Sequence, residues 1–186
     1  PKAEPFKQWL AQIGKERLDE VADPEIAIER AIYTYRQKGY SEEWITQRIR
    51  SIEIRKDLTA EWNRVGVKEG IEYAILTNDI SKAWSGMTTQ EYKEYKNLKK
   101  EGLRDNMTNL ELVLNMLAEV TTTEISQVEN PNGFEESRDV AKRGGNIAGN
   151  ARQELEEVTG KSVISKKNSK KRSIFRSYSV RQNQNG

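Results

Sequence analysis

The sequence predicts an all-α fold: a compact bundle of about six or seven helices with a disordered, basic C-terminal tail. Apolar residues recur at spacings of three and four, capping residues precede several of these runs, and no two segments show the alternation of paired strands. Apolar residues make up 35% and charged residues 32% of the chain, as in amphipathic helices with solvated outer faces. We expect one helical domain in residues 1–160, with separate sub-units 1–66 and 67–160 as an alternative, and the tail in residues 161–186.

The first three helices are expected in three ranges: 5–21, 24–38 and 42–62. Apolar side chains at near-helical spacing mark the first one: Phe6, Trp9, Leu10, Ile13 and Leu18. Asp23 and Pro24 supply an N-cap and a proline at the first helical position for the second helix, which Gly39 ends. Ser41 caps the third helix, and a restart at Thr59 is an alternative.

Four further helices are expected in the rest of the body: 70–84, 88–95, 108–129 and 134–158. Two capping boxes, Thr88 with Glu91 and Thr108 with Glu111, predict where two of them start. The helix that begins at Thr108 is apolar on most of its circumference, so we expect it at the centre of the core. Gly160 is expected to end the last helix. Four Trp and seven Tyr supply bulky side chains for the core.

The chain contains no cysteine and no histidine, which excludes whole classes of chemistry. Disulfides, thiol nucleophiles, Cys-based zinc sites and Ser-His-Asp triads need residues that are absent. We expect no enzyme activity, no cofactor and no metal site; a metal would have to be held by carboxylates, which suit magnesium, calcium or manganese. No apolar run approaches the roughly 20 residues that span a bilayer, and no signal peptide is visible, so we expect a cytoplasmic protein without membrane contact. The abrupt start at Pro1 suggests a fragment or a processed chain.

The net charge of +2 hides an uneven distribution of charge along the chain. Residues 161–186 carry eight basic residues and no acidic residue, a charge of +8. Residues 1–160 hold the other 23 of the 31 basic residues and all 29 acidic residues, a charge of −6. A tail of this charge attracts nucleic acid through counterion release, whereas the alternative is a disordered, solubilising end.

Clusters of basic residues supply candidates for nucleic-acid binding. They lie before the helix predicted at Thr108, within the last helix and in the tail: Lys96, Lys99, Lys100, Arg104, Lys142, Arg143, Lys166, Lys167, Lys170, Lys171 and Arg172. Tyr92 and Tyr95 lie among the first of them and could either stack on bases or pack inward. Acidic residues interspersed with these clusters favour the alternative of an ordinary solvated surface.

The sequence GGNIAG, residues 144–149, is similar to a dinucleotide-binding loop. Such a loop follows a strand, whereas a helical pattern precedes this segment, so we reject that interpretation. Two adjacent glycines within a helix cost roughly 1–2 kcal/mol relative to alanine. We therefore expect either a local break near Gly144 or close helix packing, with four candidate packing residues: Gly144, Gly145, Ala148 and Gly149.

Several long blocks of the sequence, taken in order, resemble one family. Within residues 2–166 the blocks are KAEPFKQWLAQIGKERLDEVADPE, AIYTYRQKGYSEEWI, GVKEGIEYAILTNDISKAWSGMT, LKKEGLRDNMTNLEL, NMLAEVTTTEIS, GFEESRDVAKRGGNIAGNAR and TGKSVIS. They are similar to the region that follows the BRO-type N-terminal domain in prophage antirepressor-like proteins and in the DNA-damage-inducible protein D family. The sequence is expected to begin where that domain, which the family resemblance associates with DNA binding, would end.

This resemblance implies a regulatory binding module rather than an enzyme, and it carries over no catalytic residue. The partners it implies are a phage repressor or a recombinase, and the basic clusters add DNA as a further partner. The alternative is a structural or oligomerisation module that only joins BRO-type domains, because the small residues near Gly145 allow close helix approach between chains as well as within one. A bacterial, cytoplasmic protein is expected in both cases, and a homo-oligomer under the alternative.

Overall fold

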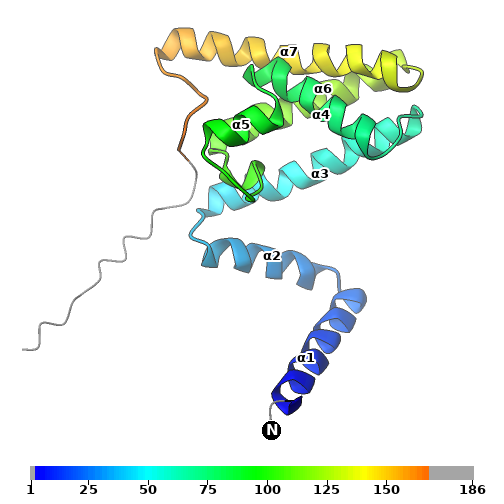
Figure 1. Ribbon diagram of the computed structural model, residues 1–186, viewed down its shortest axis with the longest axis vertical. Coiled ribbons are helices and arrows are strands. Elements are labelled where there is room, and N and C mark those ends of the chain that lie inside the picture. Colours follow the sequence, from blue (N-terminus) through cyan, green and yellow to red (C-terminus); the bar gives the residue numbers. More distant parts are fainter. Residues whose placement is uncertain (1–2, 168–186) are drawn as a thin grey trace, which may run out of the picture. The chain divides into compact units, whose positions relative to one another are not determined.

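The computed structural model describes residues 3–167, which form seven α-helices, one 3₁₀ helix and no strand (Figure 1). The all-α prediction is therefore confirmed for the described residues. Contacts divide the chain into two compact units, the first within Pro1–Tyr40 and the second within Ser41–Ser169. The first unit holds two of the helices, and the second unit holds all the others.

The first unit consists of α1 (Ala3–Ala22) and α2 (Glu25–Gln37). An ion pair joins the two helices, because Arg30 Nη2 of α2 lies 2.6 Å from Glu20 Oε1 of α1. Asp23 holds the turn between them, since its carboxylate accepts a hydrogen bond from the Glu25 backbone N–H at 3.0 Å. Pro24 occupies the N-cap position, so α2 begins one residue later than predicted.

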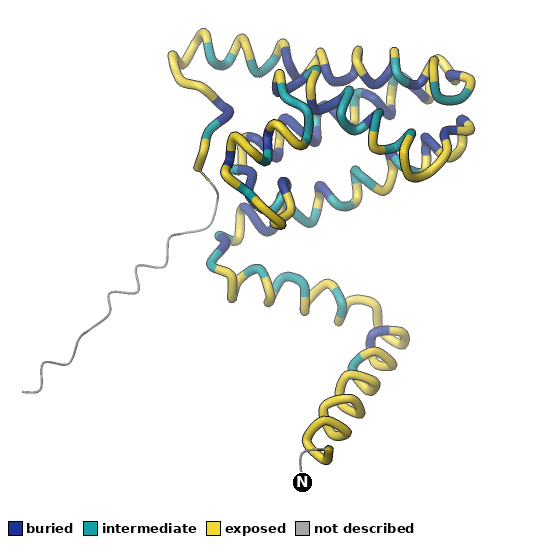
Figure 2. Tube along the Cα trace, in the orientation of Figure 1, coloured by how far each residue is buried: buried dark blue, intermediate teal, exposed yellow. Residues whose placement is uncertain are grey.

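Both helices of the first unit leave large apolar side chains exposed. Figure 2 colours nearly all of α1 and part of α2 as exposed. These side chains are Phe6, Trp9, Leu10, Ile13, Leu18, Val21, Ile26, Ile28 and Tyr33. Trp9 is 56% exposed, so the expectation that every tryptophan packs in the core is wrong for this residue. The apolar spacing predicted the helices, but it did not indicate what their apolar faces contact.

The second unit is a helix bundle with one helix in its middle. Its elements are α3 (Glu42–Arg64), α4 (Ile71–Ser85), α5 (Thr89–Tyr95), the 3₁₀ helix η1 (Arg104–Asn106), α6 (Asn109–Glu129) and α7 (Gly133–Thr159). Helix α6 packs against α3, α4 and α7, and α7 also packs along α4 (Figure 1). The expectation that the helix starting at Thr108 lies centrally is therefore confirmed. Helix α3 continues through Thr59 without a restart.

Local capping signals determine where three of these helices start. Ser41 Oγ accepts a hydrogen bond from the Trp44 backbone N–H at 3.3 Å. Thr88 and Thr108 each form the predicted capping box, in which the threonine hydroxyl and the glutamate three residues later each accept from the other's backbone N–H. These three starts are confirmed. The predicted end at Gly160 is confirmed too, since this glycine is a left-handed C-cap with a φ of 66°.

Aromatic residues fill the core of the second unit. Four of them are at most 1% exposed: Trp44, Trp62, Trp84 and Tyr92. Trp44 also donates its indole N–H to the Met107 carbonyl at 2.9 Å, which ties α3 to the segment before α6. The last described residues belong to this core as well, because Val163 and Ile164 are buried. The packed body therefore continues beyond Gly160.

The small residues of α7 lie where that helix crosses α4 and α6. All four predicted packing residues are buried there: Gly144, Gly145, Ala148 and Gly149. A Cβ built at Gly144 would lie 2.6 Å from Thr122 Cα of α6, and one built at Gly145 would lie 2.6 Å from Ala83 Cβ of α4. Helix α7 runs through Gly144 without a break, so the glycines allow close approach of helices and do not interrupt α7.

Replacing Gly144 by alanine is expected to destabilise the second unit by about 1–3 kcal/mol in urea unfolding. The added methyl group would meet backbone atoms of Thr122, and this cost exceeds the roughly 1 kcal/mol that alanine gains in helix propensity. Gly14 of α1 is the matched control, because nothing lies within 4 Å of a Cβ built there. Gly14→Ala should therefore raise the helix content measured by circular dichroism. A Gly144→Ala protein as stable as the original would contradict the close packing.

Candidate functional site

A row of polar side chains runs along the buried face of α6. Glu111, Asn115 and Glu119 follow one another at intervals of about one turn and are 0%, 6% and 1% exposed. Polar groups buried in this way must find partners, or they remain buried at a cost in free energy. Glu111 pairs with one cation and Glu119 with two, so two polar clusters lie within the bundle.

The first cluster holds a lysine inside the protein. Lys96 Nζ lies 2.8 Å from Glu111 Oε2, and the two side chains are 1% and 0% exposed. The ammonium group also donates to the carbonyl oxygens of Ser165 and Lys167, both at 2.8 Å. Glu111 in turn accepts from the backbone N–H of Thr108 at 2.6 Å and of Ser165 at 3.0 Å. Such complete bonding offsets much of the cost of removing both charges from water.

The prediction that Lys96 binds nucleic acid is wrong. Its ammonium group faces Glu111 inside the protein and cannot reach a phosphate in solvent. Tyr92 is fully buried, so of the two alternatives for this residue it packs inward. Burial together with the charge of Glu111 raises the pKa of its hydroxyl. Both side chains stabilise the fold. The sequence could not show this, because Glu111 and Ser165 are distant from them along the chain.

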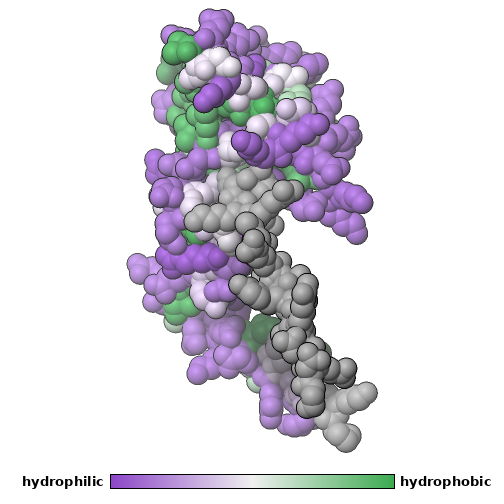
Figure 3. All heavy atoms as spheres, turned by 90° about the vertical axis from the view of Figure 1, so that its left-hand side faces the viewer, coloured by the Kyte–Doolittle hydropathy of each residue, from purple (hydrophilic) through white to green (hydrophobic). Residues whose placement is uncertain are grey.

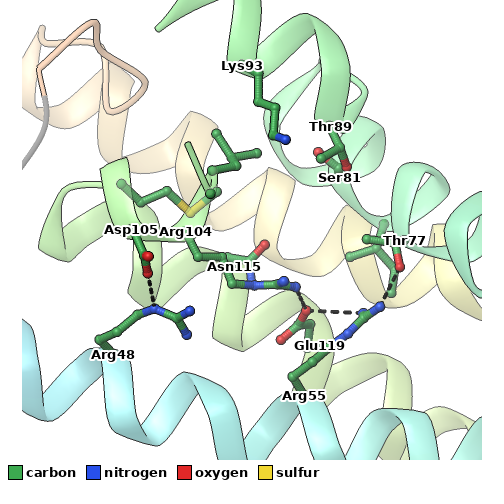
Figure 4. Close-up of a pocket in the computed structure, with 14 residues that line it drawn as sticks. Arg48, Arg55, Thr77, Ser81, Thr89, Lys93, Arg104, Asp105, Asn115 and Glu119 are labelled. Atoms are coloured by element: carbon green, nitrogen blue, oxygen red, sulfur yellow. Dashed lines mark hydrogen bonds and ion pairs between the residues drawn. The ribbon is translucent and has the colours of Figure 1, made fainter. Parts of the chain in front are cut away.

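The second cluster surrounds Glu119 and a cavity of about 270 Å³, which we call the arginine pocket. Side chains from α3, α4, α5, η1 and α6 line it (Figure 4). Its charged lining residues are four cations and two carboxylates: Arg48, Arg55, Lys93, Arg104, Asp105 and Glu119. All of them lie within the second unit. Among the predicted nucleic-acid-binding residues, Arg104 therefore belongs to a pocket and not to an open surface.

Glu119 pairs with two arginines through one oxygen atom. Arg104 Nη2 and Arg55 Nη1 both lie against Glu119 Oε1, the latter at 3.4 Å. Arg55 also donates from Nη2 to Thr77 Oγ1 of α4 at 2.6 Å. Burial lowers the pKa of Arg55; the charge of Glu119 opposes this shift and the charge of Arg104 adds to it. A single carboxylate is thus the shared counterion of two guanidinium groups.

The remaining cations of the arginine pocket differ in their pairing. Arg48 Nε donates to Asp105 Oδ1 at 2.8 Å on one side of the pocket (Figure 4). The side chain of Lys93 in α5 extends toward the pocket, and its ammonium group has no hydrogen bond or ion pair with another described residue. Three lining atoms are buried without a hydrogen-bond partner among the described residues: Arg104 Nε, Asn115 Nδ2 and Glu119 Oε2. The pocket lining therefore contains two donors and one acceptor whose hydrogen bonds are not made by the described residues.

The other predicted nucleic-acid-binding residues fall into three groups. Five of them are exposed on the second unit: Lys99, Lys100, Lys142, Lys166 and Lys167. Arg143 is also on the surface, but Glu129 and Asp139 both pair with it, so its charge is already neutralised. Three lie outside the described residues: Lys170, Lys171 and Arg172.

Sequence reasoning did not identify Arg48, Arg55 and Lys93 as members of a site. Two signals were present. Arg48 and Arg55 are seven residues apart, which places both on one face of α3. Glu119 stands eight residues after Glu111 in a helix that is otherwise largely apolar, and a polar residue at a core position requires a partner. Neither signal says which other segment supplies that partner.

Metal sites and membrane-spanning helices are two further features that the described residues do not form. No three acidic side chains among them are placed to hold a metal ion. None of their helices combines the length and the apolar character that a membrane span requires. Comparison of the chain with protein-family models and with curated protein sequences finds no match. The family resemblance, and the function that it implies, therefore remain predictions.

Replacing Lys96 by methionine is expected to destabilise the protein by about 3–5 kcal/mol in urea unfolding, because Glu111 would stay buried without its cation. Adding Glu111→Gln should recover part of that loss, since it removes the uncompensated charge. Lys99→Met is the control, at an exposed lysine three residues further along the chain. It should change stability by no more than about 0.5 kcal/mol. Equal effects of the two lysine substitutions would contradict the buried pair.

Proposed function

We propose that the chain is a regulatory binding module that acts through protein contacts, with α1 as its docking helix. Four exposed side chains carry the proposal: Phe6, Trp9, Leu10 and Ile13, which are 58%, 56%, 48% and 41% exposed. We call these four residues the α1 stripe. Their positions are i, i+3, i+4 and i+7, so they share one face of the helix. The rings of Phe6 and Trp9 stack with centroids 5.8 Å apart, which makes this end of the stripe continuous.

The α1 stripe fits an apolar groove on a partner protein. Amphipathic helices that dock into such grooves use anchors at this spacing. Exposed apolar patches of this kind mark interaction sites on proteins, and tryptophan is enriched among the residues that dominate interfaces. On the face seen in Figure 3, hydrophilic residues cover most of the described surface and hydrophobic residues form separate patches. The exposure of four apolar residues on one face distinguishes α1 from an ordinary solvated helix.

The family resemblance supplies candidates for the partner. Similarity to prophage antirepressor-like proteins suggests a phage repressor, and similarity to the DNA-damage-inducible protein D family suggests a recombinase. Both assignments place the chain in the bacterial cytoplasm. DNA is a further partner under this proposal, through the exposed lysines of the second unit and the basic residues beyond Lys167. The absence of His and Cys from the whole sequence favours binding over catalysis.

The alternative function is that of an oligomerisation module. The small residues of α7 favour it at the level of sequence, but Gly144, Gly145 and Gly149 contact α6 and α4 of the same chain. The α1 stripe is a different surface through which the chain could oligomerise, because two copies could pack their stripes against each other. A test of α1 must therefore separate a partner protein from a second copy.

Trp9→Ala is expected to weaken binding to the partner by at least about tenfold, because a central aromatic anchor commonly contributes more than about 1.4 kcal/mol. The measurement is co-sedimentation with a bacterial recombinase filament on single-stranded DNA, and in parallel with a phage repressor. Val128→Ala is the matched control, since Val128 is an apolar residue of α6 that is 83% exposed.

Three outcomes of this comparison decide between the assignments. Binding that Trp9→Ala weakens and Val128→Ala does not would support the α1 stripe as the docking surface. Equal binding by both variants would remove α1 from the proposal. Sedimentation velocity of the chain alone tests the alternative: self-association that Trp9→Ala abolishes would assign the stripe to a second copy.

The DNA contribution is tested by removing residues 168–186, which hold five of the eight basic residues of the predicted tail. The cut follows Lys167 because Lys96 bonds to the carbonyl oxygens of Ser165 and Lys167 inside the body. Binding to duplex DNA is measured as a function of salt concentration, and the logarithm of the observed binding constant is plotted against the logarithm of the salt concentration. In the shortened protein the slope should be less negative by up to about 4.5, because each cation that contacts a phosphate contributes about 0.9. Absence of salt-sensitive binding in both proteins would remove DNA from the proposal.

A further inference from the structure

The arginine pocket carries more positive than negative charge. Its lining contains four cationic side chains and two carboxylates, an excess of two positive charges around a cavity of about 270 Å³. Charges in a partly enclosed site are screened less than charges on an open surface, so this excess attracts anions more strongly than the same residues would in solvent. The excess arises within one compact unit and is independent of α1 and the proposed docking function.

Arg55 and Arg104 share Glu119 as their counterion, so a further anion would be stabilised beside these two guanidinium groups. Arg55 and Arg104 both depend on the single oxygen Oε1 of Glu119, so each guanidinium is only partly neutralised. Arg104 keeps its Nε–H buried and without a partner among the described residues. A guanidinium presents several N–H donors in a fixed plane, which suits the oxygens of a tetrahedral anion.

Two more donors approach from other helices. Lys93 comes from α5, on the opposite side of the pocket from Arg48 and Arg55 in Figure 4. Asn115 of α6 lies between them and is 6% exposed, and its Nδ2 is buried without a partner among the described residues. Buried donors without acceptors cost free energy, and an anion in the cavity would supply the missing acceptors.

We propose that the arginine pocket binds inorganic phosphate as the doubly charged hydrogen phosphate ion. Its two negative charges match the excess of two positive charges in the lining. Its unprotonated oxygens would accept hydrogen bonds from Arg104, Asn115 and Lys93. Its P–OH group would donate to Glu119 Oε2, the buried acceptor that lacks a partner among the described residues.

The size of the cavity agrees with a small anion. A water molecule occupies roughly 30 Å³ in the liquid, so about 270 Å³ accommodates a phosphate ion together with a few waters. Pockets that enclose drug-sized ligands usually measure about 300–1,000 Å³, so the arginine pocket would not enclose a whole nucleotide. Sulfate has the same charge and shape as hydrogen phosphate but no proton to donate, and it is therefore the discriminating ligand.

Substitution of Lys93 distinguishes an anion-binding site from a set of ion pairs that only hold helices together. The other three cations each have a protein partner, whereas Lys93 has none among the described residues, so Lys93→Ala should weaken anion binding without changing stability. The matched control is Lys56→Ala. Lys56 is exposed on α3, next to Arg55 in sequence, and does not line the pocket.

Isothermal titration calorimetry of the full chain with inorganic phosphate at low salt tests the proposal. We expect saturable binding, at least about tenfold weaker binding in Lys93→Ala, and unchanged binding in Lys56→Ala. At ten times the dissociation constant, phosphate should raise the Tm of the original protein by about 3–6 °C. Sulfate should bind at least about tenfold more weakly than phosphate, and Glu119→Gln should reduce that difference.

Several results would overturn the proposal. These are no saturable phosphate binding, equal phosphate binding by Lys93→Ala and Lys56→Ala, and equal affinity for phosphate and sulfate. Glycerol phosphate, a dianion without a P–OH group, should bind more weakly than free phosphate; equal or tighter binding would assign the site to a phosphate ester instead. Because Lys93→Ala leaves every described ion pair intact, the test does not depend on whether Glu119→Gln folds.

Discussion

The carboxylate of Glu111 is the constraint on which the second unit depends. It is the reciprocal acceptor of the capping box that starts α6, the counterion of Lys96 at the end of α5, and the acceptor for the Ser165 backbone. Taking such a charge out of water costs several kcal/mol, so the protein must supply these partners together. The start of α6, the end of α5 and the last described residues are consequently positioned by one chemical group.

Glu119, two turns further along α6, is a second buried carboxylate, and its hydrogen-bond partners differ from those of Glu111. One of its oxygens is shared between Arg55 and Arg104, and the other is buried without a partner among the described residues. One face of a single helix thus carries a polar cluster in which Lys96 and Glu111 are fully paired, and another with donors and an acceptor that lack partners among the described residues. The first ties α5, α6 and the last described residues together, and the second lines the arginine pocket.

Local signals in the sequence predicted the helices because both partners of each signal are close in the chain. Thr88 and Thr108 act on backbone groups three residues away, so the capping boxes are visible without a structure. Lys96 lies in the same run of lysines as the exposed Lys99, and only contacts with residues distant in sequence, such as Glu111, distinguish the two. The arginine pocket draws its lining from four α-helices and η1, so no spacing along the chain displays it. For α1 the pattern predicted an apolar face, but it could not show that this face stays exposed.

The four tryptophans are distributed so that only one of them meets solvent. Trp9 is 56% exposed, whereas Trp44, Trp62 and Trp84 are at most 1% exposed. A collisional quencher such as acrylamide would therefore reach the emission of Trp9 and leave that of the other three largely unaffected. The chain has an intrinsic fluorophore on α1 and three more inside the bundle. Events at α1 and in the second unit can thus be followed separately in the same sample, without an attached label.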